Sequence, residues 1–252
     1  MAGRTFATGD IHGDLRALLH ILAQLPVLDA GDTLVFVGDY VNRGPRSAQV
    51  IEHLRSLPTR TPAKVVTLRG NHEDAWLRVI DHGWREFVLP RAHGCRAAME
   101  SYVGKLTAKL SEPLEQVLLS GAFWPLDVVE WMRQLPYYYE DEHAIYVHAG
   151  LARDDSGFLH PADTKQKAAL LWFRDQDFFR NYRGKRVVFG HTVTEYLPEE
   201  LSSHTPADPS DMWAGPCTIG LDTGCGKGGF LTTLEMPSMT VYESQRPPRG
   251  NR

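Results

Sequence analysis

The feature that most constrains this sequence is a set of three glycine-bounded loops that carry acids and histidines. Their sequences are Gly-Asp-Ile-His-Gly, Gly-Asp-Tyr-Val-Asn-Arg-Gly and Gly-Asn-His-Glu, at 9–13, 38–44 and 70–73. Each loop follows an apolar run typical of a buried strand, at 4–8, 33–37 and 64–68. Open α/β sheets build their sites at the carboxyl ends of strands, so the three loops predict one shared site.

Helical and strand patterns alternate over the first third of the chain. Apolar residues recur with helical spacing at 14–25, from about 47 to 57, and at 73–82. This βαβαβ order predicts a parallel sheet with right-handed crossovers. Helices are then expected in an insertion at about 83–136 and again at 166–179, and a long loop is expected at 195–216. The remaining predicted strands are at 137–140, 143–147, 186–189, 217–221, 230–235 and 239–242. We expect a single domain over 1–252, with a flexible tail from about 245.

Composition excludes several classes of protein. A net charge of -4 gives no argument for binding nucleic acid or a membrane surface. The chain has no apolar run near the roughly 18 residues that a membrane span needs. A strand begins almost at once, which leaves no room for a signal peptide. The cysteines are odd in number and lack CxxC spacing, which favours free thiols and a cytoplasmic location; they are Cys95, Cys217 and Cys225.

Potential metal ligands follow five of the predicted strands. They are Asp10, His12, Asp39, Asn71, His148 and His191. Carboxylate, amide and imidazole groups suit divalent first-row metals. A site for two ions requires one carboxylate to bridge them at a separation of roughly 3.5–4 Å.

The three loops, in this order, resemble the phosphoprotein phosphatase (PPP) family of metallophosphoesterases. That family includes the eukaryotic serine/threonine phosphatases, bacterial and phage relatives, and symmetrical diadenosine tetraphosphatases. Later motifs also match, namely Val-His-Ala-Gly at 147–150, Leu-Trp-Phe-Arg at 171–174, Gly-His-Thr at 190–192 and Leu-Asp-Thr-Gly at 221–224. The resemblance covers about 4–243 and implies a calcineurin-like α/β sandwich of two mixed β-sheets flanked by helices.

The resemblance also implies a role for each matched residue. The first metal would be held by Asp10, His12 and Asp39, and the second by Asp39, Asn71, His148 and His191. Two manganese ions are expected, with iron or zinc as alternatives. Phosphate would be contacted by Arg43, Arg174 and Asn71, because the planar fork of arginine binds phosphate oxygens in pairs. His72 would be the general acid, and a metal-bridging hydroxide would attack phosphorus in line.

The chain departs from the family at Asn42, where an aspartate usually accepts a hydrogen bond from the catalytic histidine. Asn42 can still accept through its carbonyl oxygen, but it supplies no charge. We therefore expect His72 to be a weaker cation than in the usual pair. Alkyl phosphates such as phosphoserine need the proton most, whereas aryl phosphates and phosphoanhydrides need it less.

These features leave more than one substrate class open. The first expectation is hydrolysis of phosphoserine or phosphothreonine in proteins, because Gly-Asn-His-Glu is favoured there and diadenosine tetraphosphatases typically have Gly-Asn-His-Asp. Those enzymes, however, also lack the aspartate replaced by Asn42. A nucleoside-polyphosphate or other phosphoanhydride hydrolase is therefore the alternative, and a catalytically weak phosphate-binding scaffold is a third reading. The expected partner is a phosphorylated protein or small molecule, and the default oligomeric state is a monomer.

Two further expectations concern the surroundings of the site. The segment 93–102 resembles, more loosely, a bacterial segment that caps the site. The histidines that lack motif context are expected on the surface or on helices, and they are His20, His53, His82, His93, His143, His160 and His204.

Overall fold

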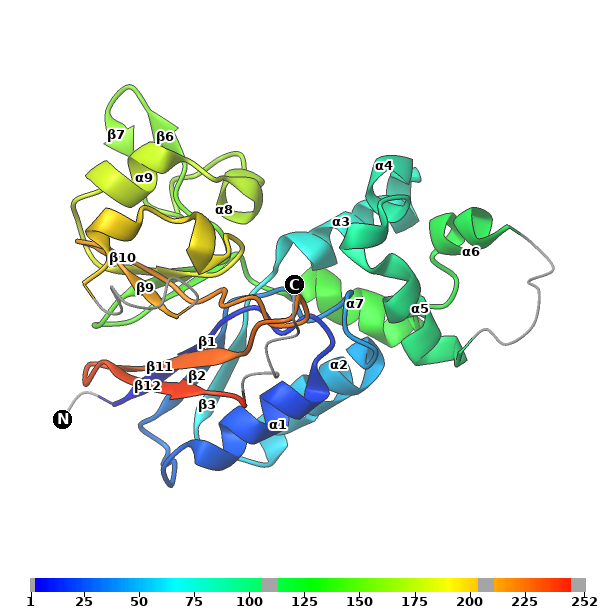
Figure 1. Ribbon diagram of the computed structural model, residues 1–252, viewed down its shortest axis with the longest axis horizontal. Helices are drawn as coiled ribbons and strands as arrows, with labels where there is room; N and C mark the ends of the chain where they lie inside the picture. Colours follow the sequence, from blue (N-terminus) through cyan, green and yellow to red (C-terminus); the bar gives the residue numbers. More distant parts are fainter. Residues whose placement is uncertain (1–2, 106–112, 204–210, 246–252) are drawn as a thin grey trace.

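The first β-sheet contains the three parallel strands that the sequence predicts. The computed structural model describes residues 3–105, 113–203 and 211–245 (Figure 1). Within them the sheet has the order β12-β11-β1-β2-β3. Its strands are β1 (Thr5–Thr8), β2 (Thr33–Phe36), β3 (Lys64–Thr67), β11 (Thr232–Met236) and β12 (Thr240–Glu243). β1, β2 and β3 are parallel, and β11 and β12 add antiparallel strands on one side, so the sheet is mixed.

The second β-sheet is also mixed and has the order β4-β5-β8-β10-β9 within the described residues. Its strands are β4 (Tyr138–Glu140), β5 (Ile145–Val147), β8 (Val187–Phe189), β9 (Trp213–Ala214) and β10 (Thr218–Gly220). β5, β8 and β10 run parallel, with antiparallel strands at both edges. A small hairpin of β6 (Arg153–Asp154) and β7 (Gly157–Phe158), which the sequence did not suggest, lies beyond this sheet.

The two sheets pack against each other through small and branched apolar side chains. Ala7, Val35 and Val66 of the first sheet share a core cluster with Tyr146 and Val188 of the second. Neighbouring residues in a strand point to opposite faces, so the alternate residues of β1 and β2 face the helices instead. Both faces of the central strands are therefore covered, which explains why their sequences read as continuous apolar runs.

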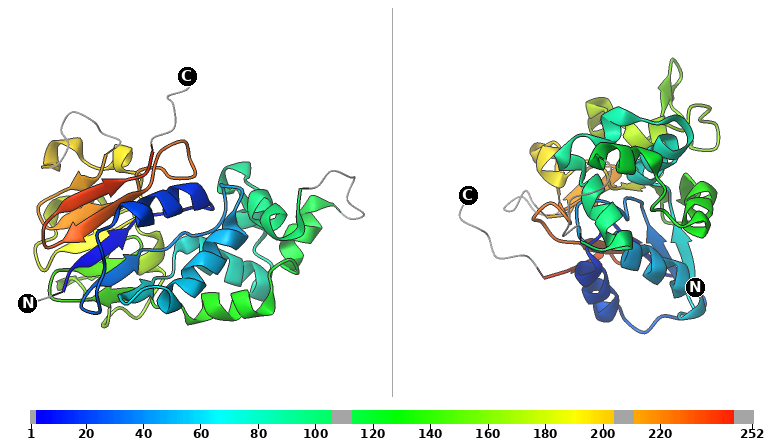
Figure 2. Two further views of the ribbon diagram at one scale, coloured as in Figure 1. Left: turned by 90° about the horizontal axis from the view of Figure 1, so that it is seen from below. Right: turned by 90° about the vertical axis from the view of Figure 1, so that its right-hand side faces the viewer.

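Helices cover the outer faces of both sheets and form the insertion. The first sheet is covered by α1 (Leu15–Gln24), α2 (Ser47–Ser56) and α3 (Asn71–His82), with the 3-10 turn η1 at Leu57–Thr59. The insertion contains α4 (Arg85–Val88), η2 (Arg91–His93), α5 (Cys95–Val103), α6 (Leu114–Ser120) and α7 (Leu126–Gln134). Its described residues hold no strand, as predicted, and its helices gather beside α3 at the end away from the second sheet (Figure 2).

The prediction of one continuous helix at 166–179 is wrong. The structure has α8 (Ala169–Trp172) and α9 (Gln176–Asn181), separated by an extended Phe173 with φ -70° and ψ 137°. Asp175 starts the second helix, because its side chain accepts a hydrogen bond from the Asp177 amide over 2.8 Å. The break places Arg174 between the two helices.

The predicted loop at 195–216 is irregular where it is described, apart from η3 (Thr194–Tyr196), η4 (Glu199–Leu201) and β9. Residues 204–210, and the tail beyond Gln245, lie outside the described residues. In the described part of the chain we find no helix long and apolar enough to cross a membrane.

Candidate metal centre

The predicted ligands converge at the carboxyl ends of strands from both sheets. Asp10 and His12 follow β1, and Asp39 follows β2. Asn71 is the first residue of α3, just after β3. From the second sheet, His148 follows β5 and His191 follows β8. All six side chains are buried, so the site draws on loops that are up to 181 residues apart.

Asp39 lies at the middle of the cluster. Its Oδ1 is 3.4 Å from His148 Nε2, and its Oδ2 is 3.5 Å from His12 Nε2 and 3.8 Å from His72 Nε2. Asp10 Oδ2 lies 3.7 Å from the same nitrogen of His12. Asp39 is shared by two groups of three potential ligands, one with His12 and His72 and one with Asp10 and His148, and these groups divide the cluster differently from the two predicted ligand sets. It is thus positioned as a carboxylate between two cation sites.

Asn71 joins the two histidines of the second sheet. Its Oδ1 lies 2.8 Å from His148 Nε2 and 2.8 Å from His191 Nδ1. His191 Nε2 is buried and has no hydrogen-bond partner among the described residues. A buried polar atom without a partner is costly, and a metal ion would remove that cost.

The charge state of the side chains also fits divalent cations. Burial, followed by the nearby Asp222 and Asp39 carboxylates, raises the pKa of Asp10 well above its usual range. Burial lowers the pKa of His12 and His191 well below theirs, so both imidazoles are neutral at physiological pH. Neutral imidazole is the form that binds metal, and a cation would offset the repulsion between the carboxylates. The residues present therefore fit a two-metal site.

Backbone carbonyl groups orient two of the imidazole rings. His12 Nδ1 lies 3.0 Å from the carbonyl oxygen of Val41, and His148 Nδ1 lies 2.9 Å from that of Val37. Since a carbonyl only accepts, each ring donates from Nδ1, and in neutral His12 this leaves the lone pair on Nε2. In both rings Nε2 is the atom that faces Asp39.

The backbone of the site is strained at five non-glycine residues with left-handed φ angles. These are His12 (47°), Asp39 (56°), Asn42 (72°), Arg43 (63°) and His191 (63°). Such a conformation costs about 1–2 kcal/mol at a residue with a side chain. Strain of this kind persists where the surrounding structure holds a side chain in a functional position.

Glu73 holds the loop that carries Asp39. The Glu73 carboxylate is buried and accepts hydrogen bonds from the amides of Gly70 (3.1 Å), Asp39 (3.0 Å), Tyr40 (2.9 Å) and Val41 (3.3 Å). Burial, followed by the charge of Asp39, raises the pKa of Glu73, and the hydrogen bonds from the amides of Tyr40 and Asp39 oppose that rise. Glu73 thus supports the loop after β2 and, through the Gly70 amide, also caps the first turn of α3.

The two predicted phosphate-binding arginines lie beside the cluster. Arg43 is half-buried, and its guanidinium contacts Nε2 of His12. Arg174 is exposed in the break between α8 and α9. It is close enough to His191 for its charge to contribute to the lowered pKa of that imidazole. Both cations therefore lie next to the cluster.

Asn42 does not use its carbonyl oxygen toward His72, so the sequence-based expectation is corrected here. Asn42 Nδ2 lies 2.7 Å from His72 Nδ1, and the Asn42 carbonyl oxygen accepts a hydrogen bond from Trp76 Nε1 over 2.8 Å. Burial lowers the pKa of His72 to about 3, with Arg43 among the smaller causes. His72 thus has no anionic partner at Nδ1.

Two neighbours of His72 were missed in the sequence. The His93 ring centre is 6.2 Å from that of His72, although His93 was expected outside the site, and Phe87 lies between 5.1 and 5.4 Å from both rings. The loose resemblance of 93–102 to a capping segment was the available signal. The Gly94 carbonyl accepts a hydrogen bond from the Arg43 amide over 3.3 Å, so this segment does pack on the site.

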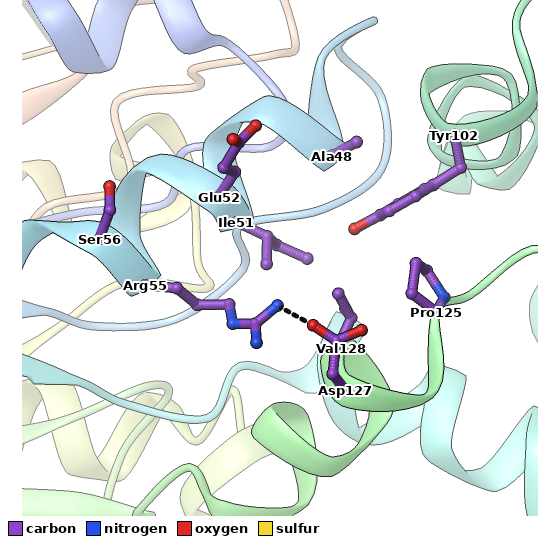
Figure 3. A pocket seen from close by; sticks show the side chains of 9 residues that line it. All are labelled: Ala48, Ile51, Glu52, Arg55, Ser56, Tyr102, Pro125, Asp127 and Val128. Carbon is purple, nitrogen blue, oxygen red and sulfur yellow. Dashed lines mark hydrogen bonds and ion pairs between the residues drawn. The ribbon is translucent and has the colours of Figure 1, made fainter.

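A cavity of about 490 Å³ lies elsewhere, between α2, α5 and α7 (Figure 3). Ile51 and Val128 form apolar parts of its wall, and the ion pair between Arg55 and Asp127 crosses it at 2.7 Å. None of the predicted site residues lines this cavity.

A sandwich of two mixed sheets, with acids and histidines at the carboxyl ends of its strands, defines a metallophosphoesterase. The chain belongs to the calcineurin-like phosphoesterase family, whose sequence profile matches residues 3–195. It is therefore a hydrolase of a family that uses divalent metal ions.

Two curated relatives have related names. The asymmetrical bis(5'-nucleosyl)-tetraphosphatase PrpE of Geobacillus sp. strain WCH70 is 28% identical over 92% of this chain and 89% of its own length. The symmetrical bis(5'-nucleosyl)-tetraphosphatase of Coxiella burnetii strain Dugway 5J108-111 is 32% identical over 58% of this chain and 42% of its own length.

Solved structures agree on the fold. A crystal structure provisionally described as a diadenosine tetraphosphatase superposes with a TM-score of 0.61 at 23% identity, covering 99% of this chain and 96% of that one. A protein serine/threonine phosphatase of Saccharomyces cerevisiae superposes with a TM-score of 0.54 at 15% identity, covering 99% and 82%. At these identities the two structures support the architecture and not a substrate.

Proposed function

We propose that this chain hydrolyses a phosphoanhydride bond of a dinucleoside polyphosphate, using two divalent metal ions. The observation that carries the proposal is the amide of Asn42 against Nδ1 of His72, where a carboxylate would favour the imidazolium. Without a negative partner, His72 offers a hydrogen bond rather than a ready proton. A leaving phosphate is stable as an anion and needs no more than that, whereas an alkoxide needs the proton itself.

The metal ligands and the basic residues have separate roles in this proposal. One ion would be held by Asp10, His12 and Asp39, and the other by Asp39, Asn71, His148 and His191. When bound, divalent ions such as Mn²⁺ supply Lewis-acid activation of water and of the phosphoryl group near neutral pH. Arg43 and Arg174 would grip the phosphoryl oxygens in pairs and orient the phosphorus for in-line displacement. His72 would donate a hydrogen bond to the leaving oxygen.

The names of the curated relatives support the same substrate class. The relative that aligns along most of the chain is a dinucleoside tetraphosphatase, and so is the shorter match. One name is asymmetrical and the other symmetrical, so the position of cleavage is a separate question. Two nucleoside diphosphates would mark symmetrical cleavage, and one monophosphate with one triphosphate would mark the asymmetrical kind.

A phosphoprotein phosphatase is the second candidate, favoured by the sequence Gly-Asn-His-Glu at 70–73. The contacts of Glu73 weaken this argument, because its carboxylate is occupied by four backbone amides. Glu73 can therefore be required for the loop with either substrate.

The test is a substrate panel with added Mn²⁺: diadenosine tetraphosphate, a phosphoserine peptide and an aryl phosphate, compared by kcat/KM. We expect the dinucleotide to exceed the phosphopeptide by at least about 100-fold, the lower end of what general acid catalysis contributes. Chromatography of the products gives the cleavage position. A phosphopeptide that matches or exceeds the dinucleotide would transfer the assignment to protein dephosphorylation.

A substitution makes the test specific to Asn42. Asn42→Asp should raise kcat for the phosphopeptide by about tenfold or more and change kcat for the dinucleotide much less. Asn181→Asp makes the same chemical change at the exposed last residue of α9 and should alter neither. Equal gains for both substrates would contradict the assigned role of Asn42.

A further inference from the structure

Trp76 is placed to control which nitrogen of His72 carries a proton. Its indole Nε1 lies 2.8 Å from Asn42 Oδ1. An indole N–H can only donate, so the atom of Asn42 that it meets must be the carbonyl oxygen. The other end of the same amide, Nδ2, therefore points to His72 Nδ1 at 2.7 Å.

An amide NH₂ group can only donate, and this determines the proton position on His72. Nδ1 must accept the hydrogen bond from Asn42, so it carries no proton. The neutral imidazole then has its proton on Nε2, the nitrogen 3.8 Å from Asp39 Oδ2 and turned to the metal cluster. With the amide reversed, the proton would sit on Nδ1 and no N–H would face the cluster.

The indole is held where it cannot leave this bond easily. Trp76 is fully buried, and its ring meets those of Phe87, Phe123 and Trp124 edge-on at 5.8, 5.2 and 5.4 Å. It also lies four residues after His72 on α3, so both side chains project from the same face of the helix. Aromatic rings of the helical insertion thus pack around the Trp76 indole and fix its orientation.

We propose that Trp76 is a positioning residue, which orients the Asn42 amide and so keeps an N–H of neutral His72 directed at the leaving oxygen. The role of this N–H at the leaving oxygen rests on the proposed function, whereas the position of the proton on His72 does not. An aspartate at position 42 would accept from both Trp76 and His72, because both of its oxygens are acceptors. The control by Trp76 therefore depends on the asparagine of this chain.

The chain contains a matched control for Trp76. Trp124 is buried in the same aromatic cluster at 3% exposure, and its Nε1 has no hydrogen-bond partner among the described residues. Trp124→Phe removes the same atoms as Trp76→Phe, but it removes no hydrogen bond. Any effect shared by both variants is an effect of packing.

The experiment is ¹⁵N NMR of histidine-labelled protein loaded with diamagnetic Zn²⁺, with the His72 signals assigned through their absence in His72→Gln. We expect wild type and Trp124→Phe to have the proton on Nε2. In Trp76→Phe a measurable fraction should move to Nδ1. An unchanged His72 in Trp76→Phe, or an equal change in Trp124→Phe, would overturn the proposal.

The asparagine provides a second arm that does not depend on the folding of Trp76→Phe. Asn42→Asp should place a proton on Nδ1, because a carboxylate there only accepts, and it should favour the imidazolium, in which Nε2 also carries a proton. Adding Trp76→Phe to that variant should then have no further effect on the proton at Nδ1. An Asn42→Asp variant whose His72 Nδ1 stayed unprotonated would also overturn the proposal. Because the NMR needs no substrate, a chain that did not cleave diadenosine tetraphosphate would refute the proposed function while these spectra still decided the role of Trp76.

Discussion

The carboxylate of Glu73 accepts a hydrogen bond from the backbone amide of Asp39 over 3.0 Å. Glu73 therefore fixes the backbone of the residue at the middle of the metal cluster. Three further amides donate to the same carboxylate. Both oxygens of Glu73 are needed, since each receives two of these bonds. The loop after β2 is therefore fixed by the first turn of α3.

Glu73→Gln should be strongly destabilising, although it preserves the shape of the side chain. One oxygen becomes an NH₂ group that faces two backbone donors, which costs about 2–5 kcal/mol. Urea denaturation measures this loss, and activity should fall with it because the Asp39 loop moves. Glu100→Gln, which touches only an exposed ion pair with Arg96 at 2.8 Å, should stay within about 0.5 kcal/mol of wild type. Similar losses in both variants would contradict the loop-holding role.

The glycines after β10 offer a matched pair of substitutions. Gly226 and Gly228 both have left-handed φ angles, of 72° and 93°. A Cβ at Gly226 would lie 2.6 Å from the Cβ of His12, whereas a Cβ at Gly228 would meet nothing within 4 Å. Both alanine variants should lose about 1–2 kcal/mol from strain. Gly226→Ala should in addition lose about tenfold or more in Mn²⁺ affinity, as measured by calorimetry. Equal affinities in the two variants would show that Gly226 does not position His12.

Asp39→Asn tests the shared carboxylate. Wild type should carry two metal ions per chain by elemental analysis, and Asp39→Asn should carry at least one fewer. Loss of a residue that only supports a metal ligand lowers activity by about 10–100-fold. The activity of Asp39→Asn should fall by more than that. Asp155→Asn, in the exposed β6–β7 turn, is the control and should change neither quantity. Full metal content in Asp39→Asn would rule out a bridging position for this residue.

The acid stability of the chain should depend on an ion pair far from the site. Asp32 is buried and accepts from Arg4 Nη2 at 2.6 Å and from Arg4 Nε at 3.0 Å, and this pairing lowers the pKa of Asp32. A lowered folded-state pKa stabilises the protein above the unfolded pKa, and the contribution disappears as pH falls through the folded value. Asp32→Asn should therefore cost about 1.5–3 kcal/mol at pH 7 and little near pH 2, by urea denaturation.

Asp127→Asn provides the comparison for Asp32→Asn. Asp127 also pairs with an arginine, Arg55, at 2.7 Å, but its side chain is 64% exposed. Solvent and salt screen such a pair, so its removal should have a much smaller effect at both pH values. If Asp32→Asn lost the same free energy of unfolding at both pH values, the contribution of Asp32 to stability would come from its shape and not from its charge.

The strands and the ligand loops could be predicted because their signals are local. A continuous apolar run that leads to a glycine and then a polar residue indicates a buried strand with a side chain at its carboxyl end, and this was sufficient to place Asp10, Asp39 and Asn71 at one edge of the sheet. The parallel order of β1, β2 and β3 followed from the helices between them. The division of the helix at 166–179 was not predicted, because apolar spacing continues through Phe173 and the start signal at Asp175 is a single side-chain bond.

The environment of His72 could not be predicted from the sequence for a different reason. The direction of the Asn42 amide depends on Trp76, and the distance between them depends on how α3 packs on the loop after β2. His93 likewise reaches the site through the fold of the insertion. No pattern within either segment encodes such contacts, since they arise between parts of the chain that meet only in the folded protein.

The left-handed residues of the metal centre also bear on evolution. Glycine would adopt each of these conformations without steric penalty, yet His12, Asp39 and His191 would lose their side-chain chemistry with it. Selection for that chemistry is what keeps these residues in a conformation that costs free energy. In a lineage released from phosphoester hydrolysis, these positions should drift to glycine or asparagine before the buried strands change. Replacement there would distinguish an inactive descendant of this fold from a working enzyme, even while its sheets remained intact.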